Sequence, residues 1–151
     1  MSLPPVPPIA AVMTALPRSI GIDARVLEAR ELMTEHDIRH LPVTEDGRLV
    51  GMVTQRDIAL VLDPELDVPF HEELRVRTVC VLDAYVVEPE TPLDAVVAEM
   101  ARRRIGSALV ARRGRLLGIF TATDACRLFA EALQGSLPGP ADGLDALGEP
   151  A

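Results

Sequence analysis

The chain has no lysine and no tryptophan, and aromatic residues make up only 3% of its 151 residues. So few aromatics argue against a stacking platform for single-stranded nucleic acid. All fifteen basic residues are arginines, the formal net charge is −8, and no strongly basic face is expected. Because binding to a phosphate backbone needs clustered cations, we do not expect a nucleic acid partner.

Cysteines and long apolar runs are also scarce. Two cysteines, Cys80 and Cys126, are too few for the disulfide framework of a short secreted protein. No apolar run approaches the roughly 20 residues that span a membrane. The proline-rich start, residues 1–8, lacks the apolar segment of a signal peptide. These absences predict a cytoplasmic protein that does not associate with membranes.

The hydrophobic content of 48% is enough for one compact domain, or for two small halves that share a core. Apolar spacing and turn residues predict the elements of a first half. They are a short helical turn at 9–14, a strand at 18–22, a helix at 24–36 with Asp23 as its N-cap, a hairpin of strands 39–44 and 48–53, and a helix from 55 to about 62.

The same order of elements is predicted a second time. It comprises a strand at 85–87, a helix from about 92 to 104, strands at 107–111 and 115–120, and a helix from about 122 to 133. We therefore expect a first repeat at residues 9–63 and a second repeat at 75–133. An acidic, proline-containing linker at 64–74 separates them. Residues 134–151 lack periodicity and are expected to be a disordered tail.

The two halves are copies of one another. At an offset of 67 residues, without a gap, ten positions are identical between residues 9–63 and 76–130. Six of these fall on one turn and one helix start, and they pair Gly47, Arg48, Leu49, Gly51, Thr54 and Asp57 with Gly114, Arg115, Leu116, Gly118, Thr121 and Asp124. One unit alone would bury a poor core, whereas two can pack sheet against sheet. The predicted fold is α/β (α+β), with two β-α-β-β-α repeats related by a pseudo-two-fold axis and the helices outside.

These motifs resemble a tandem pair of cystathionine-β-synthase (CBS) domains, a Bateman module, of the stand-alone bacterial type. The first copy carries IRHLPV at 38–43, DGRLVG at 46–51 and VTQRD at 53–57, and the second carries IGSALV at 105–110, GRLLG at 114–118 and TATD at 121–124. The resemblance covers roughly residues 9–132. It implies ligand sensing rather than catalysis, with AMP, ADP, ATP or S-adenosylmethionine as the bound ligand and no required cofactor. It also implies a homodimer formed through the helices.

In this family, the Thr and Asp of the Gly-x-x-Thr-x-x-Asp motif face the phosphate and the ribose. The chemistry is reasonable, because a helix start presents amides and a partial positive charge to a phosphate. Arg56 adds a cation, and adenine would lie between apolar strands. The expected ligand-binding residues are Ser19, Ile20, His40, Leu41, Pro42, Thr54, Arg56 and Asp57 in the first repeat, and Val86, Val87, Ser107, Ala108, Thr121 and Asp124 in the second.

Thr-x-x-Asp is also close to a capping box, in which both side chains only satisfy amides at the start of their own helix. A repeat copies caps as faithfully as ligand contacts, so this interpretation stays open. The copies are unequal, because Thr123 replaces Arg56 and Ser107 replaces His40. We therefore expect the first repeat to hold the better site for a phosphorylated ligand.

Three functions are compatible with these patterns. The first is a regulatory module that senses adenosyl nucleotides in the cleft between the repeats and acts on a separate protein. The second is a structural dimerisation or interaction module without a strongly bound nucleotide. The third is a small hydrolase or phosphotransferase. We do not expect an enzyme, because the sequence has no Ser-His-Asp, paired-carboxylate or Walker pattern. No metal site is expected either, since His36, Asp37 and His40 straddle a helix-to-strand turn.

Overall fold

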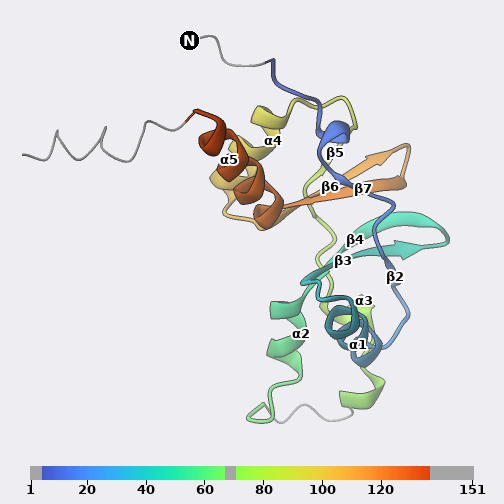
Figure 1. Ribbon diagram of the computed structural model, residues 1–151. Coiled ribbons are helices and arrows are strands. Elements are labelled where there is room, and N and C mark those ends of the chain that lie inside the picture. Colours follow the sequence, from blue (N-terminus) through green and yellow to red (C-terminus); the bar gives the residue numbers. More distant parts are fainter. Residues whose placement is uncertain (1–4, 67–70, 137–151) are drawn as a thin grey trace, which may run out of the picture.

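The computed structural model describes residues 5–66 and 71–136 (Figure 1). The first half contains η1 Ile9–Ala11, β1 Thr14–Ala15, β2 Ile20–Gly21, α1 Val26–His36, β3 His40–Glu45, β4 Arg48–Thr54 and α2 Gln55–Val61. The second contains η2 His71–Glu73, α3 Val76–Val79, β5 Val86–Val87, α4 Leu93–Arg103, β6 Ser107–Arg112, β7 Arg115–Thr121 and α5 Ala122–Ser136. Each half follows the predicted order of strand, helix, strand, strand and helix, and the predicted fold class is confirmed.

Three local predictions need correction. Strand β1 was not predicted, and α5 continues past Leu133 to Ser136. The rest of the predicted tail lies outside the described residues. The predicted N-cap of α1 is wrong, because Arg25 occupies the cap position and no side chain caps the helix. Asp23 instead accepts a hydrogen bond from Arg77 Nε at 3.1 Å, so an ion pair with a distant residue has taken the place of a local cap.

Both hairpins close with the same tight turn. Backbone φ is 51° at Asp46 and 78° at Gly47, and it is 53° at Arg113 and 79° at Gly114. Two successive positive φ angles fit the right-handed twist of a two-residue hairpin, and Asp-Gly is a favoured pair for this conformation. The second hairpin adopts the turn with an arginine in place of the aspartate. The two hairpins therefore share the same turn geometry, although the first turn residue is Asp46 in one and Arg113 in the other.

The strands form two sheets, in the orders β2-β3-β4 and β1-β7-β6-β5. The sheets pack against each other, with α1 and α2 beyond one sheet and α4 and α5 beyond the other (Figure 1). Met52 of β4 packs with Leu109 and Ile119 at their interface. The amide of Leu49 also donates to the carbonyl of Gly114 at 2.8 Å, which joins the two hairpins directly.

Each sheet is extended by the first segment of the other repeat. Strand β1, near the start of the first repeat, pairs antiparallel with β7 of the second, with Thr14 opposite Ile119. At the equivalent place, Val81 forms an antiparallel bridge with Met52 of β4. The leading segment of each repeat therefore pairs with the sheet of the other repeat. The sequence motifs did not predict this symmetrical crossing of the two segments.

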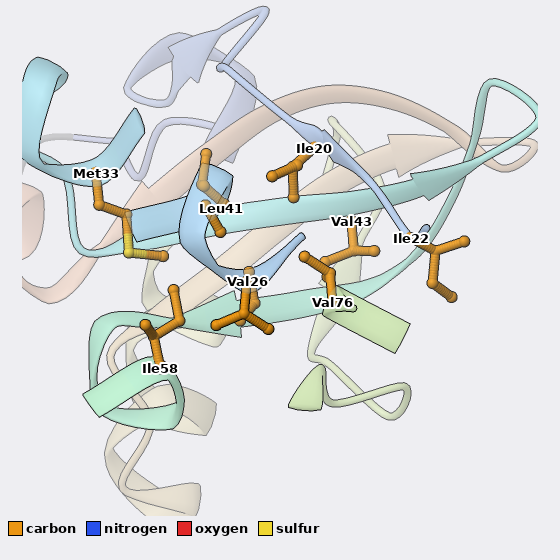
Figure 2. Packing of buried hydrophobic residues seen from close by; sticks show 10 residues of the cluster. Ile20, Ile22, Val26, Met33, Leu41, Val43, Ile58 and Val76 are labelled. Carbon is orange, nitrogen blue, oxygen red and sulfur yellow. The ribbon is translucent and has the colours of Figure 1, made fainter. Parts of the chain in front are cut away.

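The crossed leading segments also contribute residues to both hydrophobic cores. Val76 of α3 is fully buried in the first repeat, where Figure 2 shows it beside Val26 and Val43. Ile9 of η1 is fully buried in the core of the second repeat, which includes Phe120. Burying a side chain of this size stabilises a fold by roughly 1.5–3 kcal/mol. Each core is thus completed by the chain segment that leads into the other copy, and the packing crosses the expected repeat boundaries.

Candidate functional site

The repeated Thr and Asp lie where each hairpin passes into its following helix. Thr54 ends β4 and is the N-cap of α2, and Thr121 ends β7 immediately before α5. Strand pairing puts His40 opposite Thr54 and Ser107 opposite Thr121. The register therefore places His40 beside Thr54, and Ser107 beside Thr121, at the open end of each hairpin.

Thr54 and Asp57 form a complete capping box. The amide and the hydroxyl of Thr54 donate to Asp57 Oδ2 at 3.0 and 2.9 Å, and the amide of Asp57 donates to Thr54 Oγ1 at 3.2 Å. The same three bonds between Thr121 and Asp124 measure 2.9, 3.0 and 3.2 Å. The capping interpretation is therefore realised in both repeats. In each cap the two bonds to the carboxylate end on the same oxygen, Oδ2.

The amides at these helix starts are partly occupied. The amide of Gln55 donates to the carbonyl of Arg39 at 2.9 Å, and that of Ala122 donates to the carbonyl of Gly106 at 2.8 Å. The amide of Asp57 is already held by its cap. Free amides are therefore a weaker basis for phosphate binding here than the sequence suggested.

Arginine side chains flank the first helix start. Arg39 lies next to it through its carbonyl bond, and Arg56 is the second residue of α2. Both are exposed, and neither forms an ion pair within residues 5–66 and 71–136. Gly106 and Thr123 stand at the equivalent positions of the second repeat. Neither Arg39 nor Arg56 therefore has a counterpart in the second repeat, where the arginine next to the motif aspartate is Arg127.

The two carboxylates also differ in their second oxygen. Asp124 Oδ1 lies 3.5 Å from Arg127 Nη2. Asp57 Oδ1 forms no hydrogen bond or ion pair with any residue that the structure describes. At the position equivalent to Arg127, the first repeat has Leu60. One carboxylate thus presents an unused acceptor, whereas the other is engaged.

His40 is a half-buried residue that reaches the second repeat. Burial lowers its pKa, Arg39 lowers it further, and the Asp57 carboxylate opposes both. A β-carbon at Gly106 would lie 3.1 Å from His40 Nε2, so the imidazole lies against the main chain of the other copy. The site of the first repeat therefore includes a residue from the second, which sequence reasoning missed.

Cys80 is a second residue that sequence reasoning left out of the site. It belongs to the exchanged segment and packs against the core of the first repeat. Burial raises the pKa of its thiol, and the Asp57 carboxylate contributes in the same direction. Cys80 therefore lies near Asp57, although its place in the sequence is in the second copy. Its match to Met13 was visible in the repeat, but no sequence signal indicated that the segments exchange.

Several predicted ligand residues are part of the cores. Leu41, Pro42 and Ala108 are fully buried and Ile20 is nearly so, which places these residues in the hydrophobic cores rather than at an open site. A cavity of about 330 Å³ lies between the repeats, lined by Leu49, Val50, Gly51, Leu82, Ala84, Val86, Val87, Glu88, Ala111, Arg113 and Gly114. Val86 and Val87 line it, whereas Thr121 and Asp124 do not. The residues predicted for the second repeat are thus not gathered around this cavity.

Two further features concern the described part of the chain only. Residues 5–66 and 71–136 bring together no group of three His, Cys, Asp or Glu side chains suited to a metal ion. None of their helices combines the length and the apolar character needed to cross a membrane.

Two copies of a β-α-β-β-α unit, packed sheet to sheet with a Thr–Asp cap at the end of each hairpin, define a duplicated α/β module. The CBS domain family matches residues 9–63 and 76–131, which is more than half of the chain. The chain belongs to the CBS domain family as a tandem pair, and the resemblance seen in the sequence is confirmed.

Solved structures share this fold. A protein assigned to acetoin utilization (AcuB) from Vibrio cholerae matches with a TM-score of 0.76 and 25% identity, over 96% of this chain and 99% of that one. The CBS domain pair of MJ0100, solved with 5′-methylthioadenosine and S-adenosylmethionine, matches with a TM-score of 0.73 and 24% identity, over 85% and 99%. CBSX2, solved with AMP, matches with a TM-score of 0.73 and 23% identity, over 83% and 98%.

Curated relatives are much longer than the matched region. The L-aspartate semialdehyde sulfurtransferase of Methanocaldococcus jannaschii is 29% identical over 127 residues, which is 83% of this chain and 24% of that protein. The inosine-5′-monophosphate dehydrogenase of Korarchaeum cryptofilum is 36% identical over 107 residues, which is 70% of this chain and 21% of that protein. The chain thus spans about a quarter or less of these relatives.

Proposed function

We propose that this CBS pair is a regulatory module that binds an adenosyl ligand of the AMP, ADP or ATP class at the site of the first repeat. The observation that carries the proposal is the Asp57 carboxylate. Its Oδ2 serves the helix cap, while Oδ1 is unused by the described residues. A carboxylate oxygen can accept hydrogen bonds from ribose hydroxyls. The cap and the ligand contact are therefore compatible, because they use different oxygens.

The surroundings of Asp57 favour a phosphorylated ligand. Arg39 and Arg56 are exposed arginines whose main chain lies at the helix start, and guanidinium groups bind phosphate well. His40 and Cys80 add half-buried walls from the two copies. The solved complexes of CBSX2 with AMP and of MJ0100 with S-adenosylmethionine support the ligand class, and S-adenosylmethionine remains a candidate for the less cationic second site.

The proposed module acts by binding rather than by catalysis, with the ligand as a signal for a separate regulated protein.

We further propose that it works as a homodimer formed through α5. Three residues of this helix, Cys126, Phe129 and Leu133, are exposed at a helical spacing, and Phe129 is 66% exposed. An apolar face of this kind is typical of a protein interface. Light scattering should give twice the monomer mass, and Phe129→Glu should give the monomer.

The alternative is a structural dimerisation module that binds no nucleotide strongly. The specific observation in its favour is that both capping boxes are complete without a ligand. In this case Thr54 and Asp57 would serve only the start of α2.

Ligand titration separates the two functions. Calorimetry and thermal melts with AMP, ATP, NADH and S-adenosylmethionine should show binding of an adenosyl ligand. A ligand at 100 times its Kd stabilises the fold by about 2.7 kcal/mol.

Asp57→Ala should weaken AMP binding at least tenfold. Asp124→Ala loses an equivalent cap and should leave the stronger binding intact. Unchanged melting temperatures at millimolar ligand would favour the structural module, and loss of binding in Asp124→Ala alone would reverse the ranking of the sites.

A further inference from the structure

The two Asp carboxylates of this duplicated module differ by one ion pair. Asp124 Oδ1 lies 3.5 Å from Arg127 Nη2. Asp57 Oδ1 has no such contact among the described residues, because the position equivalent to Arg127 is Leu60. Leu60 is 59% exposed, and its apolar side chain cannot form an ion pair. A single difference between the copies thus decides whether this acceptor is occupied.

Arg127 is held in place from two sides. It lies three residues after Asp124 and four before Glu131 on α5, and residues at these spacings share one face of a helix. Its Nη1 donates to Glu131 Oε1 at 3.4 Å. The side chain of Asp124 is only 19% exposed, so solvent screens this pair less than one that is fully in water. Glu131 therefore keeps the guanidinium group next to the carboxylate.

We propose, on the basis of the proposed function, that Arg127 is a specificity-determining residue that restricts ribose binding at the second repeat by occupying Asp124 Oδ1. A ribose hydroxyl that approaches Asp124 has to displace the guanidinium group. A ribose that approaches Asp57 meets no such competitor. The two copies of one motif then bind the same ligand with unequal affinity, and the first repeat fills first.

The probe has to separate the ribose from the phosphate, because an arginine can also bind phosphate. Adenosine has the ribose and the adenine but no phosphate, so it reports competition for the carboxylate alone. AMP adds the phosphate to the same scaffold. Comparing adenosine with AMP therefore distinguishes an arginine that blocks the ribose from one that attracts the phosphate.

The experiment uses the full chain and isolates one site at a time. In an Asp57→Ala background, which leaves the second site, Arg127→Leu installs the residue of the first copy. We expect it to raise adenosine affinity about fivefold, as the loss of one partly screened ion pair predicts. In an Asp124→Ala background, which leaves the first site, Leu60→Arg should lower adenosine affinity by a similar factor. Positions 60 and 127 are both exposed, so neither exchange disturbs a core.

Calorimetry gives the adenosine and AMP affinities of four proteins: Asp57→Ala with and without Arg127→Leu, and Asp124→Ala with and without Leu60→Arg. Unchanged adenosine affinity on Arg127→Leu overturns the proposed restriction. So does a loss of AMP affinity with adenosine affinity unaltered, which would make Arg127 a phosphate contact. If the native chain binds neither adenosine, AMP nor S-adenosylmethionine, the proposed function fails and the role of Arg127 fails with it. Opposite shifts from Arg127→Leu and Leu60→Arg would support the proposal, because a purely structural ion pair would not change ribose binding in both directions.

Discussion

The carbonyl of Val81 lies so close to Gly51 that a β-carbon at position 51 would collide with it. Main-chain atoms cannot move aside as a flexible side chain can, so Gly51→Ala should force the exchanged segment away from β4. We expect a loss of about 2 kcal/mol in the free energy of unfolding, which is typical of overpacking. Urea titration of the variant against the native chain measures this loss.

Gly118→Ala provides the comparison within the same protein. At this equivalent position the atom nearest to an alanine β-carbon would be the flexible Met13 sulfur, and the Thr14 carbonyl oxygen would lie 3.0 Å away. We therefore expect a smaller loss than at Gly51. Gly21→Ala, with no atom within 4 Å, should change stability by less than about 0.5 kcal/mol. Equal losses at all three glycines would contradict this account of the close approach.

Because the leading segments cross, a mutation in one of them should destabilise the core of the other repeat. Ile9→Ala removes a fully buried side chain and should cost about 2–4 kcal/mol. Because Ile9 packs with the second repeat, hydrogen exchange should accelerate first in β6 and β7. Val76→Ala, its counterpart, should act first on β3 and β4. The opposite result would be faster hydrogen exchange in the repeat to which each mutated residue belongs in the sequence. That result would show that each leading segment packs with its own repeat.

The capping boxes should stabilise the chain whether or not a ligand is bound. Thr54→Ala and Thr121→Ala each remove a hydroxyl that caps a helix, and each should cost about 1 kcal/mol in the free energy of unfolding. Thr54→Ser keeps the hydroxyl and should retain most of this stability. Thr34→Ala is a suitable control, because its hydroxyl only donates to the Arg30 carbonyl on an exposed helix face. A cost at Thr34 equal to that at Thr54 would argue against a special role for the caps.

His40 should make stability depend on pH below neutrality. Burial lowers its pKa in the folded chain below the ordinary value of about 6.5, so the unfolded chain binds more protons between these two values. The free energy of unfolding should therefore fall as the pH drops from 6.5 through the folded pKa. His40→Gln should remove this slope. An NMR titration that places the pKa of His40 above 6.5 would contradict the prediction, and Asp57→Ala should lower this pKa further because Asp57 opposes the shift.

Features set by local chemistry were predictable from the sequence. The Asp46-Gly47 turn follows from the left-handed backbone that a two-residue hairpin needs. The cap at Thr54 follows from the spacing of a hydroxyl and a carboxylate. The glycine of the turn and the Thr-x-x-Asp cap both recur in the second copy, as Gly114 and as Thr121 with Asp124, and this repetition supported the predicted fold class.

Features set by distant partners were not predictable. Strand β1 has two residues and exists only because β7 pairs with it, which no local pattern can signal. Asp23 looked like an N-cap, but Arg77, far along the chain, holds its carboxylate. For the candidate site, the same limit hid Cys80 and Gly106, which join Asp57 and His40 through the packing of the two copies. The difference at Arg127 was visible in the alignment of the repeats, yet its meaning depended on the geometry of its guanidinium group.

The crossed leading segments make each half of the fold depend on the other. A chain with only one repeat would lack the buried residue that the other copy supplies here, Val76 for the first core and Ile9 for the second. The missing side chain would leave a void, and a void of this kind destabilises a core. The two repeats therefore form one cooperative unit rather than two independent domains.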